Sequence, residues 1–118
     1  MRIFKDFRFE AAHFLPNVPD THQCKRMHGH SYRLRVLIEG KPGNESGWVM
    51  DFADIKSAVK PVIRRLDHQC LNDIDGLENP TAENLAIWIW NEIKPVLSSL
   101  TEIHLNETES SGCIYNGV

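Results

Sequence analysis

A cysteine and two histidines lie within the stretch CKRMHGH, which runs from Cys24 to His30. His28 and His30 are two positions apart, so on a β-strand their side chains project to the same face. Imidazole is a common ligand of zinc and also suits iron, copper and nickel. The stretch therefore indicates either part of a metal site or a coincidence of polar residues.

His13 is the candidate for a third ligand. Residues 3–13 and 28–39 alternate between polar and apolar positions, which is typical of strands with one buried face. The apolar parity of the first segment ends at His13, and that of the second begins at His28 and His30. Adjacent antiparallel strands would bring the three imidazoles together, as in a catalytic zinc site with an open fourth position. The alternative is three partly buried histidines that hydrogen-bond to the backbone.

Cys24 has two interpretations. As a fourth ligand it would close a structural zinc site, and as a free thiol beside a histidine it would act as a catalyst. The stretch RLDHQC favours catalysis, since Asp67 would orient His68 and His68 would activate the thiol. The alternative for this pair is an ordinary helix C-terminal turn, where the dipole favours a cationic histidine. A ligand pair of His68 and Cys70 is least favoured, because the sequence suggests no further partner.

Glu107 continues the inward parity of a strand that begins near Thr101. A carboxylate at the end of an apolar face is costly to bury unless it is paired or hydrogen-bonded. The N–H and amino group of a pterin or guanine would satisfy both oxygens in a bidentate manner. We therefore expect Glu107 to bind a ligand of this class, with a solvent-exposed strand end as the alternative.

The elements that must position these residues follow from the hydrophobic periodicity. A helical pattern begins after Asp51, a predicted N-cap, and contains Pro61, which should kink or break it. A second helix is predicted to begin after Thr81 and to end near Pro95. Two further strands follow. The order ββααββ predicts an α+β fold in one domain, residues 1–118, with a four-stranded antiparallel sheet and two helices on one face.

The composition excludes several classes of protein. The 118 residues carry 13 basic and 16 acidic side chains, so the net charge of −3 gives no reason to expect nucleic acid or an anionic membrane as partner. No apolar run approaches the length of a transmembrane helix, and the stretch MRIFKDFRFE does not resemble a signal peptide. Three scattered cysteines make a poor disulfide framework, so we expect a reduced cytoplasmic protein.

Six segments, taken in order, resemble the 6-pyruvoyl-tetrahydropterin synthase family: FEAAHFLP, CKRMHGHSY, GWVMDFADIK, LDHQCLND, NPTAENLAIWIW and ETESSGCIY. Within the family they most closely resemble the bacterial 6-carboxy-5,6,7,8-tetrahydropterin synthases of queuosine biosynthesis. The resemblance covers almost the whole chain. It implies the tunnelling fold (T-fold), which agrees with the element order above, assembled as a homohexamer of two trimers with sites between subunits.

The resemblance also implies roles for individual residues. One group would bind Zn²⁺, a second would move protons, and a third would bind the pterin substrate. In that order the groups are His13, His28 and His30; Cys24, Asp67 and His68; and Glu107, Thr108 and Thr81. Cys24 would accordingly lie beside the metal without binding it.

The implied reaction converts 7,8-dihydroneopterin triphosphate to 6-carboxy-5,6,7,8-tetrahydropterin, acetaldehyde and triphosphate. It needs no redox cofactor, because the ring is reduced as the side chain is oxidised. One alternative is 6-pyruvoyl-tetrahydropterin synthase activity, which releases triphosphate without acetaldehyde. Another is a non-enzymatic zinc-stabilised oligomer with Cys24 as fourth ligand. Lys25 and Arg26 are either ligands of the triphosphate or solvated loop charges.

Overall fold

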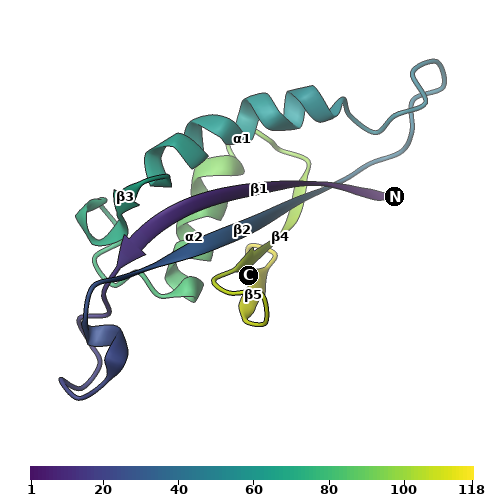
Figure 1. The fold of residues 1–118 in the computed structure, drawn as a ribbon. Coiled ribbons are helices and arrows are strands. Elements are labelled where there is room, and N and C mark those ends of the chain that lie inside the picture. The colour runs from purple at the N-terminus through teal and green to yellow at the C-terminus, as the bar shows by residue number, and fades with distance from the viewer.

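Two long strands form the centre of the computed structural model, which describes residues 1–118. Strand β1 (Arg2–His13) and strand β2 (His28–Glu39) pair antiparallel along their whole length, from Arg2 opposite Glu39 to His13 opposite His28 (Figure 1). This register puts the apolar parity of both strands on one face. The three histidines predicted as ligands consequently lie at one end of the hairpin.

The sheet has five strands, in the order β3-β1-β2-β4-β5. Strand β4 (Leu100–Asn106) pairs antiparallel with β2, and β5 (Gly112–Tyr115) pairs antiparallel with β4. The predicted count of four strands omitted β3 (Gln69–Cys70), which pairs parallel with β1. A strand of two residues has no periodicity, so the sequence pattern could not reveal it. The predicted α+β fold with its mainly antiparallel sheet is confirmed.

Both helices lie on the same side of the sheet (Figure 1). Helix α1 (Phe52–Leu66) begins after Asp51, whose Oδ1 accepts a hydrogen bond from the backbone N–H of Ala53 at 2.9 Å. Of the two expectations at Pro61, a kink or a break, the break is wrong, because the helix continues to Leu66. Pro61 and Ser57, whose carbonyl loses its helical partner, are both exposed, so water can satisfy that carbonyl.

Helix α2 (Ala82–Ile93) has the predicted limits. The hydroxyl of Thr81 accepts a hydrogen bond from the N–H of Asn84 at 3.1 Å, and the helix ends before Pro95. Two single-turn 3₁₀ helices, η1 (Gln23–Lys25) and η2 (Leu71–Asp73), lie in the connections. Neither α-helix has the length and apolar composition needed to cross a membrane.

The hydrophobic core lies between the helices and one face of the sheet. Its 24 buried residues form a single cluster, including Tyr32, Leu34, Val36 and Ile38 of β2, all of them fully buried. The other face carries the opposite parity of the same strands, including Asp6, Arg8 and Arg33, and no helix covers it (Figure 1). The sheet thus separates a buried apolar side from an open, charged one.

Candidate metal centre and active site

Three imidazoles converge at the end of β1 and β2 on the covered side of the sheet. The ring centroids of His13 and His28 are 4.5 Å apart, those of His28 and His30 are 4.9 Å apart, and those of His13 and His30 are 5.1 Å apart. One ring nitrogen of each lies within 4.8 Å of the other two. The His13–His28 register and the two-residue spacing of His28 and His30 produce this arrangement.

Backbone carbonyls orient two of the three rings. Nδ1–H of His13 donates to the carbonyl of Pro80 at 2.8 Å, and Nδ1–H of His28 donates to the carbonyl of Arg26 at 2.7 Å. Each bond requires the proton on Nδ1, which leaves a lone pair on Nε2. Nε2 of His13 and Nε2 of His30 are buried and form no hydrogen bond of good geometry, although Oε1 of Glu107 lies 3.1 Å from Nε2 of His30. Buried nitrogens of this kind in a shared cluster fit a bound metal ion.

The cluster favours the neutral imidazoles that a metal requires. Burial lowers the pKa of His13 below its usual value and outweighs the hydrogen bond to Pro80, which raises it. Burial also lowers the pKa of His30, although the nearby carboxylate of Glu107 acts in the opposite direction. Both rings are therefore deprotonated near neutral pH, ready to bind a cation.

Glu107 lies directly beside this cluster. It follows the last residue of β4, and its Oε1 is 3.1 Å from Nε2 of His30. Its side chain is 25% exposed, so the carboxylate is neither fully buried nor free in solvent. Its backbone N–H donates to the carbonyl of Ser111, which closes the β4–β5 turn. A half-buried carboxylate held next to three imidazoles can accept hydrogen bonds from a ligand that enters the site.

Asp67 and His68 form a hydrogen-bonded pair at the C-terminus of α1. Oδ2 of Asp67 lies 3.0 Å from Nδ1 of His68, while Oδ1 accepts the backbone N–H of Glu10 at 2.9 Å. The bond from Glu10, followed by the bond from His68, holds the pKa of Asp67 below its usual value. The aspartate therefore remains a carboxylate that orients the imidazole.

The backbone of His68 adopts an unusual conformation. Its φ of 59° lies in the left-handed region that few residues other than glycine adopt. The N–H of His68 donates to the carbonyl of Glu10 at 2.6 Å, and the parallel pairing of β3 with β1 follows immediately. This turn presents a histidine side chain that is 77% exposed. Strained positions of this kind are frequent at functional sites.

A cavity of about 480 Å³ is lined by one residue of each group, His30 and His68. It lies between the ends of β1, β2 and β3, and His30, His68 and Cys70 contribute to its lining. The structure thus brings His68, which Asp67 orients, to the same cavity as His30, one of the three clustered histidines. Cys70 does not belong to the group of possible metal ligands formed by His13, His28 and His30.

Cys24 lies in η1, in the loop that joins β1 to β2. Its carbonyl accepts the N–H of Leu15 at 2.8 Å and its N–H donates to Nδ1 of His22 at 3.0 Å, which fixes its backbone. The half-buried thiol is free and does not belong to the cluster of His13, His28 and His30. The predicted role as a non-ligating thiol is compatible with this position.

The two remaining predicted site residues, Thr81 and Thr108, lie in different surroundings. Thr81 caps α2 with its hydroxyl, so its side chain already has a structural role. It follows Pro80, whose carbonyl orients His13. Thr108 is exposed in the β4–β5 turn, next to Glu107. The carbonyl of Pro80 and the two-residue β3 are functional features that sequence reasoning missed, because a backbone carbonyl leaves no signal in the residue type.

Comparisons with known proteins place the chain among pterin enzymes. Residues 2–118 match the family described as 6-pyruvoyl tetrahydropterin synthase. A 6-carboxy-5,6,7,8-tetrahydropterin synthase of Synechocystis is 40% identical over 96% of this chain and 91% of its own length. A dihydroneopterin monophosphate aldolase of Pyrococcus furiosus is 39% identical over 79% of this chain and 75% of its own length.

A solved structure gives the same result for the fold. The 6-pyruvoyl tetrahydropterin synthase of Caenorhabditis elegans superposes with a TM-score of 0.92 at 28% identity, covering 100% of this chain and 96% of its own. The likeness extends over both helices and the sheet, so the T-fold predicted from the sequence is confirmed, with β3 added between the helices to the predicted element order.

Proposed function

The chain belongs to the 6-pyruvoyl tetrahydropterin synthase family, and we propose that it is a zinc-dependent carbon–carbon lyase with the 6-carboxy activity. It would convert 7,8-dihydroneopterin triphosphate to 6-carboxy-5,6,7,8-tetrahydropterin, acetaldehyde and triphosphate, a step of queuosine biosynthesis. The 40% identity with the Synechocystis 6-carboxy-5,6,7,8-tetrahydropterin synthase supports this branch. The observation that carries the proposal is the convergence of His13, His28 and His30 next to Glu107.

His13, His28 and His30 would hold the zinc ion through their lone-pair nitrogens. When bound, zinc supplies a Lewis acid that polarises the side-chain oxygens of the substrate and acidifies the neighbouring C–H bond. The protein fixes the geometry, since Pro80 and Arg26 hold two of the rings by their carbonyls.

Glu107 would orient the pterin ring. Both its oxygens can accept hydrogen bonds, from the ring N–H and from the exocyclic amino group. The substrate side chain would then extend toward the histidines, because Oε1 of Glu107 is only 3.1 Å from His30. Thr108, exposed in the same turn, would contribute to the same pocket, and Thr81 would border it.

Cys24 and His68 would move protons between the side chain and the ring, with Asp67 orienting His68 through Nδ1. The thiol would take a proton as thiolate, and His68 would accept or return one through Nε2. Cys24 lies in η1 and His68 in the turn between α1 and β3, and no hydrogen bond joins them within one chain. In keeping with the assembly that the family resemblance implies, we propose that a second copy completes each site, in a homohexamer built as a dimer of trimers.

The free state of all three cysteines supports the cytoplasm as the working compartment. The second candidate activity is 6-pyruvoyl-tetrahydropterin synthesis, favoured by the TM-score of 0.92 to the nematode enzyme. Incubation of the zinc-loaded protein with 7,8-dihydroneopterin triphosphate tests both. Acetaldehyde together with the 6-carboxy product supports the first activity, and triphosphate release without acetaldehyde supports the second. Firmly held zinc without turnover would favour a non-enzymatic, zinc-stabilised oligomer.

A further inference from the structure

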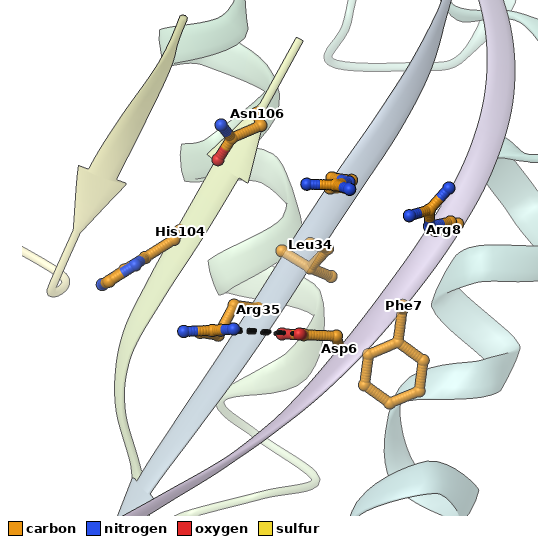
Figure 2. A pocket seen from close by; sticks show the side chains of 8 residues that line it. Asp6, Phe7, Arg8, Leu34, Arg35, His104 and Asn106 are labelled. Carbon is orange, nitrogen blue, oxygen red and sulfur yellow. Dashed lines mark hydrogen bonds and ion pairs between the residues drawn. The ribbon is translucent and has the colours of Figure 1, made fainter. Parts of the chain in front are cut away.

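A second polar site lies on the open face of the sheet, away from the helices and the histidine cluster. It is a cavity of about 340 Å³ across β1, β2 and β4. Figure 2 shows Asp6 and Arg8 on β1, Arg35 on β2, and His104 and Asn106 on β4, side by side across the three strands. Six of its eight lining residues are polar or charged. None of them has a role in the activity proposed above.

The charges of this cavity do not balance. Arg8, Arg33 and Arg35, here named the arginine cluster, face a single carboxylate, Asp6. Asp6 is already paired with Arg35, at 2.8 Å from Nε to Oδ1 and 3.0 Å from Nη2 to Oδ2. Two positive charges remain uncompensated, in a chain whose net charge is −3. The excess is therefore a local feature of this face.

The two uncompensated arginines are direct neighbours. Arg8 and Arg33 lie opposite each other in the β1–β2 pairing, and Asn106 lies opposite Arg33 on the other side. Like charges opposite each other on two strands are destabilising. None of the ion pairs in the structure includes either residue. The free protein bears an unfavourable juxtaposition that a bound anion would relieve.

The neighbouring acidic residues do not supply that anion. Glu10 accepts a hydrogen bond from the hydroxyl of Ser31 at 2.6 Å. Glu102 is engaged by His104 at 2.8 Å and by Arg2 at 3.4 Å. Neither carboxylate forms an ion pair with Arg8 or Arg33. These two exposed arginines therefore keep planar, permanently charged N–H donors that are free to bind an anion.

We propose that the arginine cluster binds an oligophosphate on the open face of the sheet. Guanidinium groups match phosphate oxygens in bidentate geometry, and two adjacent free guanidinium groups match two adjacent phosphate groups. The phosphate chain rather than a base is recognised, because Phe7, the only Phe, Tyr or Trp in the lining, is 5% exposed. The proposal is independent of the pterin activity, since the site lies on the opposite face.

The test is calorimetric titration of the intact, zinc-loaded protein with inorganic triphosphate, with zinc content measured before and after. We expect binding that Arg33→Gln weakens about tenfold or more, the loss typical of one charge-assisted contact. Arg64→Gln removes the same charge from an exposed position on α1 and is expected to leave binding unchanged. Absence of heat with the wild-type protein, or equal affinities of wild type and Arg33→Gln, would overturn the proposal.

Melting temperatures and nucleotide binding test the proposal in two further ways. The melting temperature of free Arg33→Gln should equal or exceed that of the wild type, because the opposed charges are removed, and Arg8→Gln should weaken binding in the same way. Triphosphate should raise the melting temperature of the wild type by more than that of these variants, in which only the active site could still bind it. Adenosine triphosphate should bind no more tightly than inorganic triphosphate, and much tighter binding of the nucleotide would contradict recognition of the phosphate chain alone.

Discussion

The two faces of the same pair of strands place charged and titratable side chains in opposite environments. On the covered face, burial favours neutral imidazoles at His13 and His30, so the site is prepared for a cation. On the open face, Arg8 and Arg33 keep their charges next to each other in solvent, so that site is prepared for an anion. Alternation with a period of two assigns each residue to its face, and the helices that cover only one face create the difference in dielectric environment.

The largest expected effect comes from removing a ligand on the covered face. His13→Ala should lower zinc affinity by more than about 100-fold and abolish turnover. Substituting residues that only hydrogen-bond to metal ligands already lowers metal affinity by about 10- to 100-fold, and loss of a ligand itself should cost more. Zinc content by mass spectrometry and product formation measure the two effects. His104→Ala, on the open face, is the matched control and should retain zinc. Equal zinc content in the two variants would remove His13 from the metal site.

Substitution of Cys24 separates a catalytic thiol from a structural ligand. Cys24→Ala should keep zinc and the fold, while turnover falls by about 10²- to 10⁴-fold, the usual contribution of a proton-transfer group. Turnover, zinc content and circular dichroism of the same preparation are needed. Joint loss of zinc and of structure would identify Cys24 as a fourth ligand and support the non-enzymatic interpretation.

A smaller effect is expected at the edge of the cluster. Glu107→Gln should weaken pterin binding by about 10- to 100-fold, because a charge-assisted hydrogen bond is replaced by a neutral one with one mismatched donor. Zinc should remain bound. Fluorescence titration with a non-reactive pterin gives the affinity, and an affinity equal to that of the wild type would place Glu107 outside the pocket.

The next prediction concerns active sites that are shared between two copies of the chain. If each active site combines Cys24 of one copy with His68 of another, mixing inactive Cys24→Ala and His68→Ala proteins after dissociation and reassembly should restore part of the turnover. Each variant alone should stay inactive. Mass in solution far above one 13.5 kDa chain is expected for the parent protein. A monomeric mass, or no complementation, would contradict sites shared between subunits.

The smallest expected effect lies on the open face. The hydrogen bond from Arg35 lowers the pKa of Asp6 below its usual value. A lowered folded-state pKa means that the pair stabilises the fold above the unfolded pKa of about 3.9 and loses this contribution as pH falls through the folded value. Asp6→Asn should therefore lower the urea midpoint slightly at pH 7 and not at strongly acidic pH, since exposed ion pairs contribute little.

Secondary structure could be predicted best where the hydrophobic pattern in the sequence was long. Strands β1 and β2 extend over twelve residues each, and their alternation predicted the pairing, the buried parity and the meeting of three histidines. Helix caps at Asp51 and Thr81 were predicted from single residues with a clear local preference. By contrast, β3 is only two residues long and was not predicted. Pro61 was expected to kink or break α1, but the helix continues through it, and its exposed side tolerates the proline.

The sequence alone determined which residues share a face, because a period of two is a local property of the chain. The sequence also determined which residue types could bind a metal, and its motifs identified the family. Only the tertiary structure decided how these residues meet. The Pro80 carbonyl orients His13 across 67 positions of the sequence, and β3 holds Asp67 and His68 beside β1. The arginine cluster likewise exists because antiparallel register places Arg8 opposite Arg33. Such contacts depend on chain register and packing, which no local pattern encodes.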